Sequence, residues 1–106
     1  MQSLQTEQEL RIDVMELKKA ALLYRAINHR LRQEMLRIIH NQMRMTVTDI
    51  YVKLRLEQSV ASQHLAILRK AGLVNTEREG KNIFYSVNYG KLKTIHLKAE
   101  EINHQG

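Results

Sequence analysis

The sequence predicts a mainly helical domain with one small β-hairpin, a fold of the α+β class. Apolar residues recur at spacings of three and four over most of the chain, which is the period of amphipathic helices. The exception is residues 73–88, where two short runs flank Glu79-Gly80-Lys81-Asn82, a typical hairpin tip. The second run, IFYSVN, is rich in β-branched and aromatic residues.

The composition fits one domain and excludes several classes of protein. The chain has 106 residues, a net charge of +6 and a pI of about 9.8, which is compatible with a nucleic-acid partner. It has no cysteine, which excludes disulfides and thiolate metal sites. No apolar run reaches the ~18 residues of a membrane span, so we expect a cytoplasmic protein without a membrane partner. One domain is expected over 1–106, with flexible ends at 1–5 and 105–106.

Residues 5–27 are predicted to form a long helix with apolar surface on two sides. A 4-3-4-3 spacing makes a seam like that of a coiled coil: Leu10, Val14, Leu17, Ala21 and Tyr24. Further apolar residues lie off that seam, so one side is predicted to face its own domain and the other a second chain. A helix with one wide core-facing side is the alternative. Asn28 interrupts the helix and is a candidate N-cap for the next, at 29–41.

Two helices in the middle of the chain are predicted to form a helix-turn-helix. The first, 46–54, has Thr46 as a candidate N-cap with Asp49 three residues on. The second lies between Leu56 and Gly72, and its inner stripe is apolar: Ala61, Leu65 and Leu68. Its outer stripe is small or hydrogen-bonding: Ser59, Ser62, Gln63 and Ala66. Such short side chains let the helix body come close to a partner, and the helix fits a DNA major groove.

A basic hairpin is predicted to follow this helix. Its strands lie at 73–78 and 83–88, with Arg78 and Lys81 at or near the tip. After a helix-turn-helix, such a hairpin is a wing, which commonly touches the phosphate backbone or the minor groove; a plain solvated hairpin is the alternative. A last helix is predicted at 91–104, with a second apolar stripe: Leu92, Ile95, Ala99 and Ile102. Stripes at both ends of the chain indicate a homodimer built from the terminal helices.

The order of these elements resembles the ArsR/SmtB family of winged helix-turn-helix transcriptional repressors. Three segments carry the resemblance: AINHRLRQEMLRII at 26–39, SVASQHLAILRKAGLV at 59–74 and REGKNIFYSVN at 78–88. In the first segment, His29 and Arg30 stand where the family commonly has Asp-Pro. The resemblance implies a homodimer that binds imperfect inverted repeats in double-stranded DNA, with the first and last helices in the dimer interface.

The resemblance also implies which residues touch DNA. The expected contacts are Gln58, Ser59, Ser62, Gln63, His64, Arg78, Lys81 and Asn82. Gln63 is suited to a bidentate contact with adenine, and the serines to base edges or phosphates. His64 lies between the two stripes of its helix, so a packed structural histidine is as good an interpretation as a DNA contact.

The residues with which family members bind sensor metals are missing. Thr46 and Thr48 stand where one type of site has Cys-x-Cys, and a hydroxyl is a poor ligand for soft metals. The positions of a second, terminal-helix site hold poor zinc ligands: Tyr89, Lys91, Ile102 and Gln105. One further set of low-probability zinc or nickel ligands is spaced by four residues: His96, Glu100 and His104. A polar helix face is the plainer interpretation, so we expect no metal and no cofactor, and the effector stays unassigned.

The predicted function is a sequence-specific DNA-binding regulator, a repressor that binds an inverted-repeat operator as a homodimer. A winged-helix module for protein contacts, with only weak nonspecific DNA binding, is the alternative. An enzyme is not expected, because the sequence offers no cysteine nucleophile and no glycine-rich phosphate loop, and its spacing singles out no Ser, His and acid set.

Overall fold

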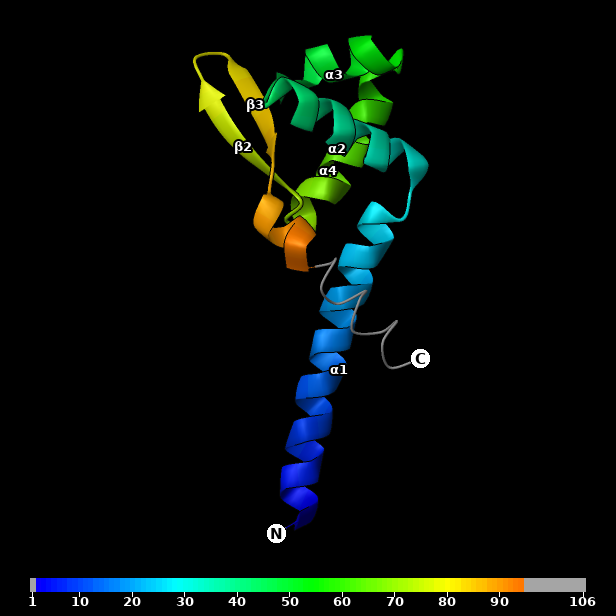
Figure 1. The fold of residues 1–106 in the computed structure, drawn as a ribbon, viewed down its shortest axis with the longest axis vertical. Helices are drawn as coiled ribbons and strands as arrows, with labels where there is room; N and C mark the ends of the chain where they lie inside the picture. The colour runs from blue at the N-terminus through cyan, green and yellow to red at the C-terminus, as the bar shows by residue number, and fades with distance from the viewer. Residues whose placement is uncertain (1, 95–106) are drawn as a thin grey trace.

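The fold is a cluster of short helices and a small sheet, from which one long helix projects (Figure 1). The computed structural model describes the backbone of residues 2–94 and the side chains of residues 14–94. In chain order the elements are α1 Gln2–Ile27, α2 Arg30–Gln42, β1 Met45–Thr46, α3 Val47–Leu54, α4 Gln58–Lys70, β2 Val74–Glu79 and β3 Asn82–Val87. Residues 89–94 are helical again. The predicted winged helix-turn-helix order is confirmed, with one strand added.

Within residues 14–27, the C-terminal end of α1 packs against the rest of the chain. Ala26 is 2% exposed, and Leu23 and Ile27 lie against the core. Earlier in α1, large apolar side chains are exposed: Val14, Met15, Leu17, Leu22 and Tyr24. Ala21 of the predicted seam is exposed as well. A row of apolar side chains in solvent marks a surface that is suited to a partner.

α2 begins with a histidine cap instead of the predicted asparagine cap. His29 has an extended backbone (φ −151°, ψ 123°), and its Nδ1 accepts a hydrogen bond from the Leu31 N–H at 3.2 Å. The Asn28 prediction is wrong because Asn28, directly after α1, closes the last turn of that helix: its N–H donates to the Tyr24 carbonyl at 2.7 Å. His29 therefore marks the change of direction between the two helices.

The two-residue strand β1 was not predicted from the sequence. It pairs antiparallel with β3, Met45 opposite Tyr85 and Thr46 opposite Phe84, which gives the sheet order β1-β3-β2. Thr46 is also the N-cap of α3: its Oγ1 accepts from the Asp49 N–H at 3.2 Å, and the Asp49 carboxylate accepts from the Thr46 N–H at 3.4 Å. The predicted capping box is confirmed.

Thr46→Ala is expected to lower the free energy of unfolding by about 0.5–2 kcal/mol, because the Asp49 N–H loses its acceptor. Thr48→Ala is the matched control, since Thr48 is exposed in the first turn of the same helix. Urea unfolding followed by circular dichroism measures both. Equal losses in the two variants would show that the cap is not the source of the effect.

Two glycines set the path of the chain after α4. Gly72 has φ +78°, its N–H donates to the Arg69 carbonyl, and the next N–H donates to the Leu68 carbonyl, both at 2.9 Å. This is a Schellman ending, which turns the chain sharply into β2. At the other end of β2, Glu79 pairs with Asn82 around Gly80-Lys81, and Gly80 has φ +61°. A glycine first in a two-residue connection gives a type II′ hairpin turn, whose twist matches the strands.

The core lies where α2, α3 and α4 meet the sheet. Its largest fully buried side chains are Met35, Ile39, Ile50, Leu65, Leu68 and Leu73. Val74 and Val87, paired across β2 and β3, are buried at the base of the hairpin. None of the described helices has the length and apolar character needed to cross a membrane.

Candidate nucleic-acid interface

Helix α4 has the two faces predicted from its sequence. The inner face is fully buried: Ala61, Leu65 and Leu68 are each 0% exposed. The outer face is exposed: Gln58, Ser59, Ser62, Gln63 and Ala66. The buried stripe anchors the helix on the core, so the short polar side chains are presented on a rigid surface.

The turn between α3 and α4 fixes the direction of α4. Arg55 caps α3 in a left-handed conformation (φ 55°, ψ 47°), and the Leu56 N–H donates to the Tyr51 carbonyl at 2.9 Å. Glu57 is the N-cap residue of α4, but its side chain accepts no capping hydrogen bond. The first turn of α4, with Gln58 and Ser59, therefore has N–H groups free of a side-chain cap, and a helix N-terminus favours phosphate oxygens.

The wing tip presents the predicted polar and basic residues. Arg78, Lys81 and Asn82 are all exposed, and the Arg78 Nε donates to the Gly80 carbonyl at 3.3 Å. The tip lies at the same end of the molecule as α3 and the start of α4, opposite the N-terminus of α1 (Figure 1). The predicted contacts from α4 and from the hairpin are thus gathered at one end.

Arg44 holds the wing in place, a role that was not predicted from the sequence. Its guanidinium forms a bidentate ion pair with the Glu79 carboxylate, at 3.0 Å and 2.6 Å, and lies 3.8 Å from the centre of the Phe84 ring. The hydrogen bond from Arg44 lowers the pKa of Glu79. The ion pair thereby joins the wing to Arg44, directly before β1, and neutralises the charge of Glu79 near the tip. No spacing in the sequence indicates this pair, because its members are 35 positions apart.

His64 lies at the junction of α1, α2 and α4. Its Nδ1 is 3.2 Å from the Arg32 Nη1, and its ring centre is 4.8 Å from that of His29. Burial, followed by the nearby His29 and Arg32, lowers the pKa of His64. The packed structural interpretation of this histidine thus has direct contacts in its support. A contact of the same residue with DNA stays a prediction.

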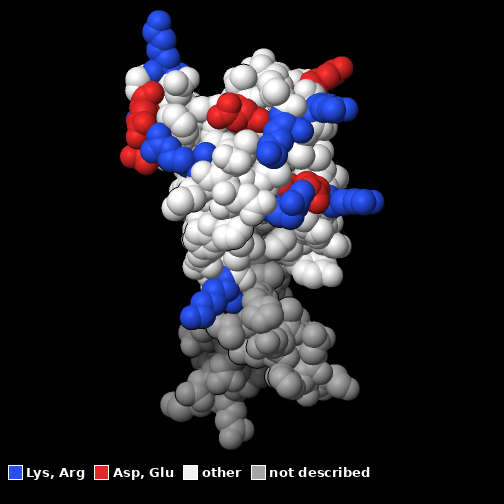
Figure 2. Space-filling view, turned by 45° about the horizontal axis from the view of Figure 1, so that its top comes forward, with Lys and Arg blue, Asp and Glu red and all other residues white. Residues whose placement is uncertain are grey.

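Charge at this end of the molecule is mixed. Figure 2 shows blue basic side chains standing out beside the wing and over the helices, with red acidic side chains between them. Two acidic residues belong to β2, Glu77 and Glu79, and alternate with Arg78. Successive side chains of a strand point to opposite faces, so the acids and Arg78 lie on opposite faces of the wing. On the face shown in Figure 2, the exposed basic groups are therefore separated by acidic ones.

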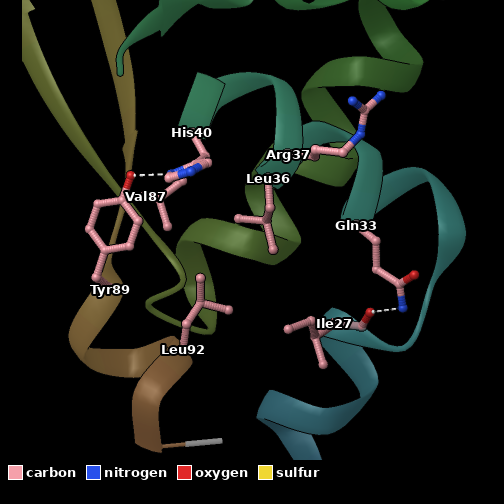
Figure 3. A pocket seen from close by; sticks show the side chains of 8 residues that line it. All are labelled: Ile27, Gln33, Leu36, Arg37, His40, Val87, Tyr89 and Leu92. Carbon is pink, nitrogen blue, oxygen red and sulfur yellow. Dashed lines mark hydrogen bonds between the residues drawn. The ribbon is translucent and has the colours of Figure 1, made fainter. Parts of the chain in front are cut away.

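An open hollow of about 390 Å³ lies on another side, between α2, β3 and the helical residues after Asn88 (Figure 3). Its apolar wall is formed by Ile27, Leu36, Val87 and Leu92. The polar groups around it are engaged with their neighbours: His40 Nδ1 lies 2.7 Å from the Tyr89 hydroxyl, and the Gln33 amide donates to the Ile27 carbonyl at 2.8 Å. Leu92, a predicted dimer residue, is half-buried against its own core.

Several predicted residues lie outside the part that the structure describes. For the dimer interface these are the side chain of Leu10 and the residues Ile95, Ala99 and Ile102; for the metal hypothesis they are His96, Glu100 and His104. Among the described residues, no three His, Cys, Asp or Glu side chains gather in a way that could hold a metal ion.

The buried and exposed faces of α4, the turn before it and the basic wing tip define a winged helix-turn-helix protein. The profile of the family described as "Bacterial regulatory protein, arsR family" matches residues 30–76. Transcriptional activator HlyU of Vibrio cholerae is 37% identical over 78 residues, which are 73% of this chain and 70% of that protein. Transcriptional repressor PagR of Bacillus anthracis is 32% identical over 85 residues, 80% of this chain and 85% of that protein.

Solved structures agree with this assignment. The crystal structure of PagR matches with a TM-score of 0.63 over 71% of this chain and 85% of that chain. An ArsR-like transcriptional regulator from Rhodococcus sp. RHA1 has a TM-score of 0.76 over 85% of this chain and 84% of that chain; at 20% identity it shows the shared fold. The chain belongs to the ArsR family of bacterial regulatory proteins. It is a DNA-binding transcriptional regulator and not an enzyme, as predicted.

Proposed function

We propose that the chain is a homodimeric, cytoplasmic repressor that reads an inverted-repeat operator with α4 and the wing. The observation that carries the proposal is the outer face of α4, where small and amide side chains are exposed on a helix whose inner face is fully buried. A helix with such a face can enter the major groove deeply, because the exposed side chains from Gln58 to Ala66 are all small or uncharged.

Each exposed group of α4 and the wing has a role in this proposal. Gln63 reads an adenine through two hydrogen bonds, and Ser59 and Ser62 bond to base edges or phosphates. Gln58 lies in the first turn of α4, where phosphates are favoured. From the wing, Lys81 and Arg78 meet phosphates, with Asn82 beside them.

The dimer follows from the exposed apolar seam of α1. Val14, Leu17, Ala21 and Tyr24 are all exposed in one chain, although they repeat at the spacing of a coiled coil. Two chains joined through α1 and the terminal helix would place their α4 helices in major grooves on one side of the duplex, about 34 Å apart or a multiple of that distance. An inverted repeat is the sequence that matches a two-fold symmetric protein.

The direction of regulation is proposed from one relative. PagR is named a transcriptional repressor, whereas HlyU is named a transcriptional activator. Repression requires only that the dimer occupy a promoter, which needs no further surface. In vitro transcription from a promoter that contains the tightest duplex selected from a randomised pool tests this: added protein should lower the transcript yield, and a rise would reverse the assignment.

Gln63→Ala is expected to weaken binding to the selected duplex by about 1–3 kcal/mol while leaving binding to random duplex nearly unchanged. Lys81→Ala is expected to weaken binding to both duplexes similarly, because a phosphate contact carries no sequence information. Fluorescence anisotropy at fixed salt measures the four affinities. Lys19→Ala is the control for Lys81, since Lys19 is an exposed lysine on α1, away from α4 and the wing.

The same titration separates the proposal from the protein-contact alternative. A sequence-specific regulator keeps its preference for the selected duplex at about 0.2 M salt, whereas purely electrostatic binding is largely lost there. Equal and weak binding to both duplexes at that salt would favour a winged-helix module for protein contacts.

A further inference from the structure

Arg32 of α2 joins the end of α1 to the recognition helix α4. Its Nε donates to the Ala26 carbonyl at 2.6 Å, and its Nη2 donates to the Arg25 carbonyl at 2.9 Å. Its Nη1 lies 3.2 Å from the Nδ1 of His64 on α4. Carbonyls in the last turn of a helix lack partners within the helix, so Arg32 satisfies two of these acceptors and uses its third nitrogen to hold α4.

The direction of the Arg32–His64 hydrogen bond follows from the chemistry of arginine. A guanidinium has only donors, so the His64 Nδ1 must be the acceptor, and the imidazole must be neutral with its proton on Nε2. His29 is under the same constraint, because its Nδ1 accepts from the Leu31 N–H as the N-cap of α2. Two histidines 4.8 Å apart therefore both need an unprotonated Nδ1 in this arrangement.

A proton on either Nδ1 would convert an acceptor into a donor and bring a positive charge beside Arg32. The charged or titratable side chains that shift the pKa of His64 are His29, from the α1–α2 connection, and Arg32, from α2; no carboxylate of the described chain is among them. The junction thus has no counter-charge to stabilise a protonated imidazole. Burial and these two neighbours lower the pKa of His64.

We propose that Arg32 is a positioning residue for the recognition helix, and that protonation of His64 releases this hold, so that sequence-specific DNA affinity falls under mildly acidic conditions. This inference rests on the proposed function, because it assumes that α4 reads DNA. Through Arg32, the proposal connects α1, which carries the exposed apolar seam, with α4, which carries Gln63.

The sign of the pH dependence follows from the direction of the pKa shift. The arranged junction favours neutral His64, so the contact is fully present above the ordinary histidine pKa of about 6.5 and is lost as the pH falls through the lowered pKa of His64. General electrostatics has the opposite sign: acid adds positive charge to an already basic chain and should strengthen its attraction to phosphates. A loss of specific affinity in acid is therefore not an ordinary charge effect.

The test compares wild type with the double variant His29→Asn/His64→Gln in the full chain. Asparagine is a favoured N-cap, and glutamine keeps an acceptor for Arg32, but neither side chain titrates. Affinity for the tightest duplex from a randomised pool and for a random duplex is measured at about pH 7.5 and about pH 5.5, at constant ionic strength. Melting temperature without DNA is measured at the same two values.

On going to the lower pH, the ratio of specific to random affinity should fall about fivefold or more for wild type and stay nearly constant for the double variant. The melting temperature should also fall further for wild type. Arg32→Lys keeps the positive charge but loses the planar set of guanidinium donors. Its ratio of specific to random affinity should therefore already be low at about pH 7.5. Parallel profiles for wild type and the double variant, in both affinity and melting temperature, would overturn the proposal.

Failure of the proposed function gives a different result. In that case wild type shows no preference for any duplex at about pH 7.5. The coupling is then decided by the melting temperatures alone: a larger acid shift in wild type supports the release of the junction, and equal shifts refute it.

Discussion

Leu65→Ala is expected to lower the free energy of unfolding by about 2–5 kcal/mol. Leu65 is 0% exposed on the inner face of α4, so its truncation removes apolar burial and leaves a cavity beneath the recognition helix. Domains of this kind are stable by only about 5–15 kcal/mol, which makes this a large share of the total. Urea unfolding followed by far-ultraviolet circular dichroism measures the loss.

Ile67→Ala is the matched control on the same helix. Ile67 is 43% exposed, so a similar truncation should change the free energy of unfolding by less than about 1 kcal/mol. A comparable loss in both variants would contradict the separation of α4 into a buried face and an exposed face.

Leu17→Glu is expected to convert the homodimer into monomers and to weaken binding to the selected duplex by about 100-fold or more. Leu17 is 68% exposed in one chain and lies on the α1 seam, so the proposed interface would have to bury a carboxylate against apolar side chains. A monomer engages one half-site and loses the gain from binding two at once. Sedimentation equilibrium reports the mass, and fluorescence anisotropy the affinity.

Lys19→Gln changes the net charge by the same single unit and serves as the control. Lys19 is exposed two residues beyond Leu17, about 200° around the helix from it. The Lys19→Gln variant should stay dimeric and lose little affinity for DNA. If the Leu17→Glu variant were still a dimer, the interface would lie elsewhere on the molecule. If the Lys19→Gln variant were a monomer, the change in net charge would be the cause of dissociation.

Features that depend on neighbouring residues could be predicted from the sequence. The stripe of Ala61, Leu65 and Leu68 repeats with the helical period, and a helix packed on a core must bury such a stripe. The capping box at Thr46 and the turn at Gly80 follow from three or four residues each. The resemblance to the ArsR family rested on the order of the elements and on three short segments, 26–39, 59–74 and 78–88, and was confirmed.

Features that depend on distant residues could not be predicted. Strand β1 has two residues, too few to show the alternation of a strand, and exists because β3 lies beside it. The role of Arg44 cannot be predicted from the sequence, because its partner Glu79 is 35 positions away. The sequence does not decide between the two interpretations of His64, because Arg32, which contacts its Nδ1, is 32 positions away. The seam of α1 could be predicted from its spacing, and its exposure in one chain is what the proposed dimer rests on.

The projecting α1 has a consequence for how the amount of protein controls its activity. Its apolar seam stands away from the core of its own chain, so the proposed dimer would gain stability from association (Figure 1). By mass action, the dimeric fraction and the melting temperature then rise with protein concentration. Because only the dimer engages both half-sites, operator occupancy would rise more steeply than in proportion to synthesis. A modest change in expression near the dissociation constant of the dimer would then switch the regulated promoter over a narrow range.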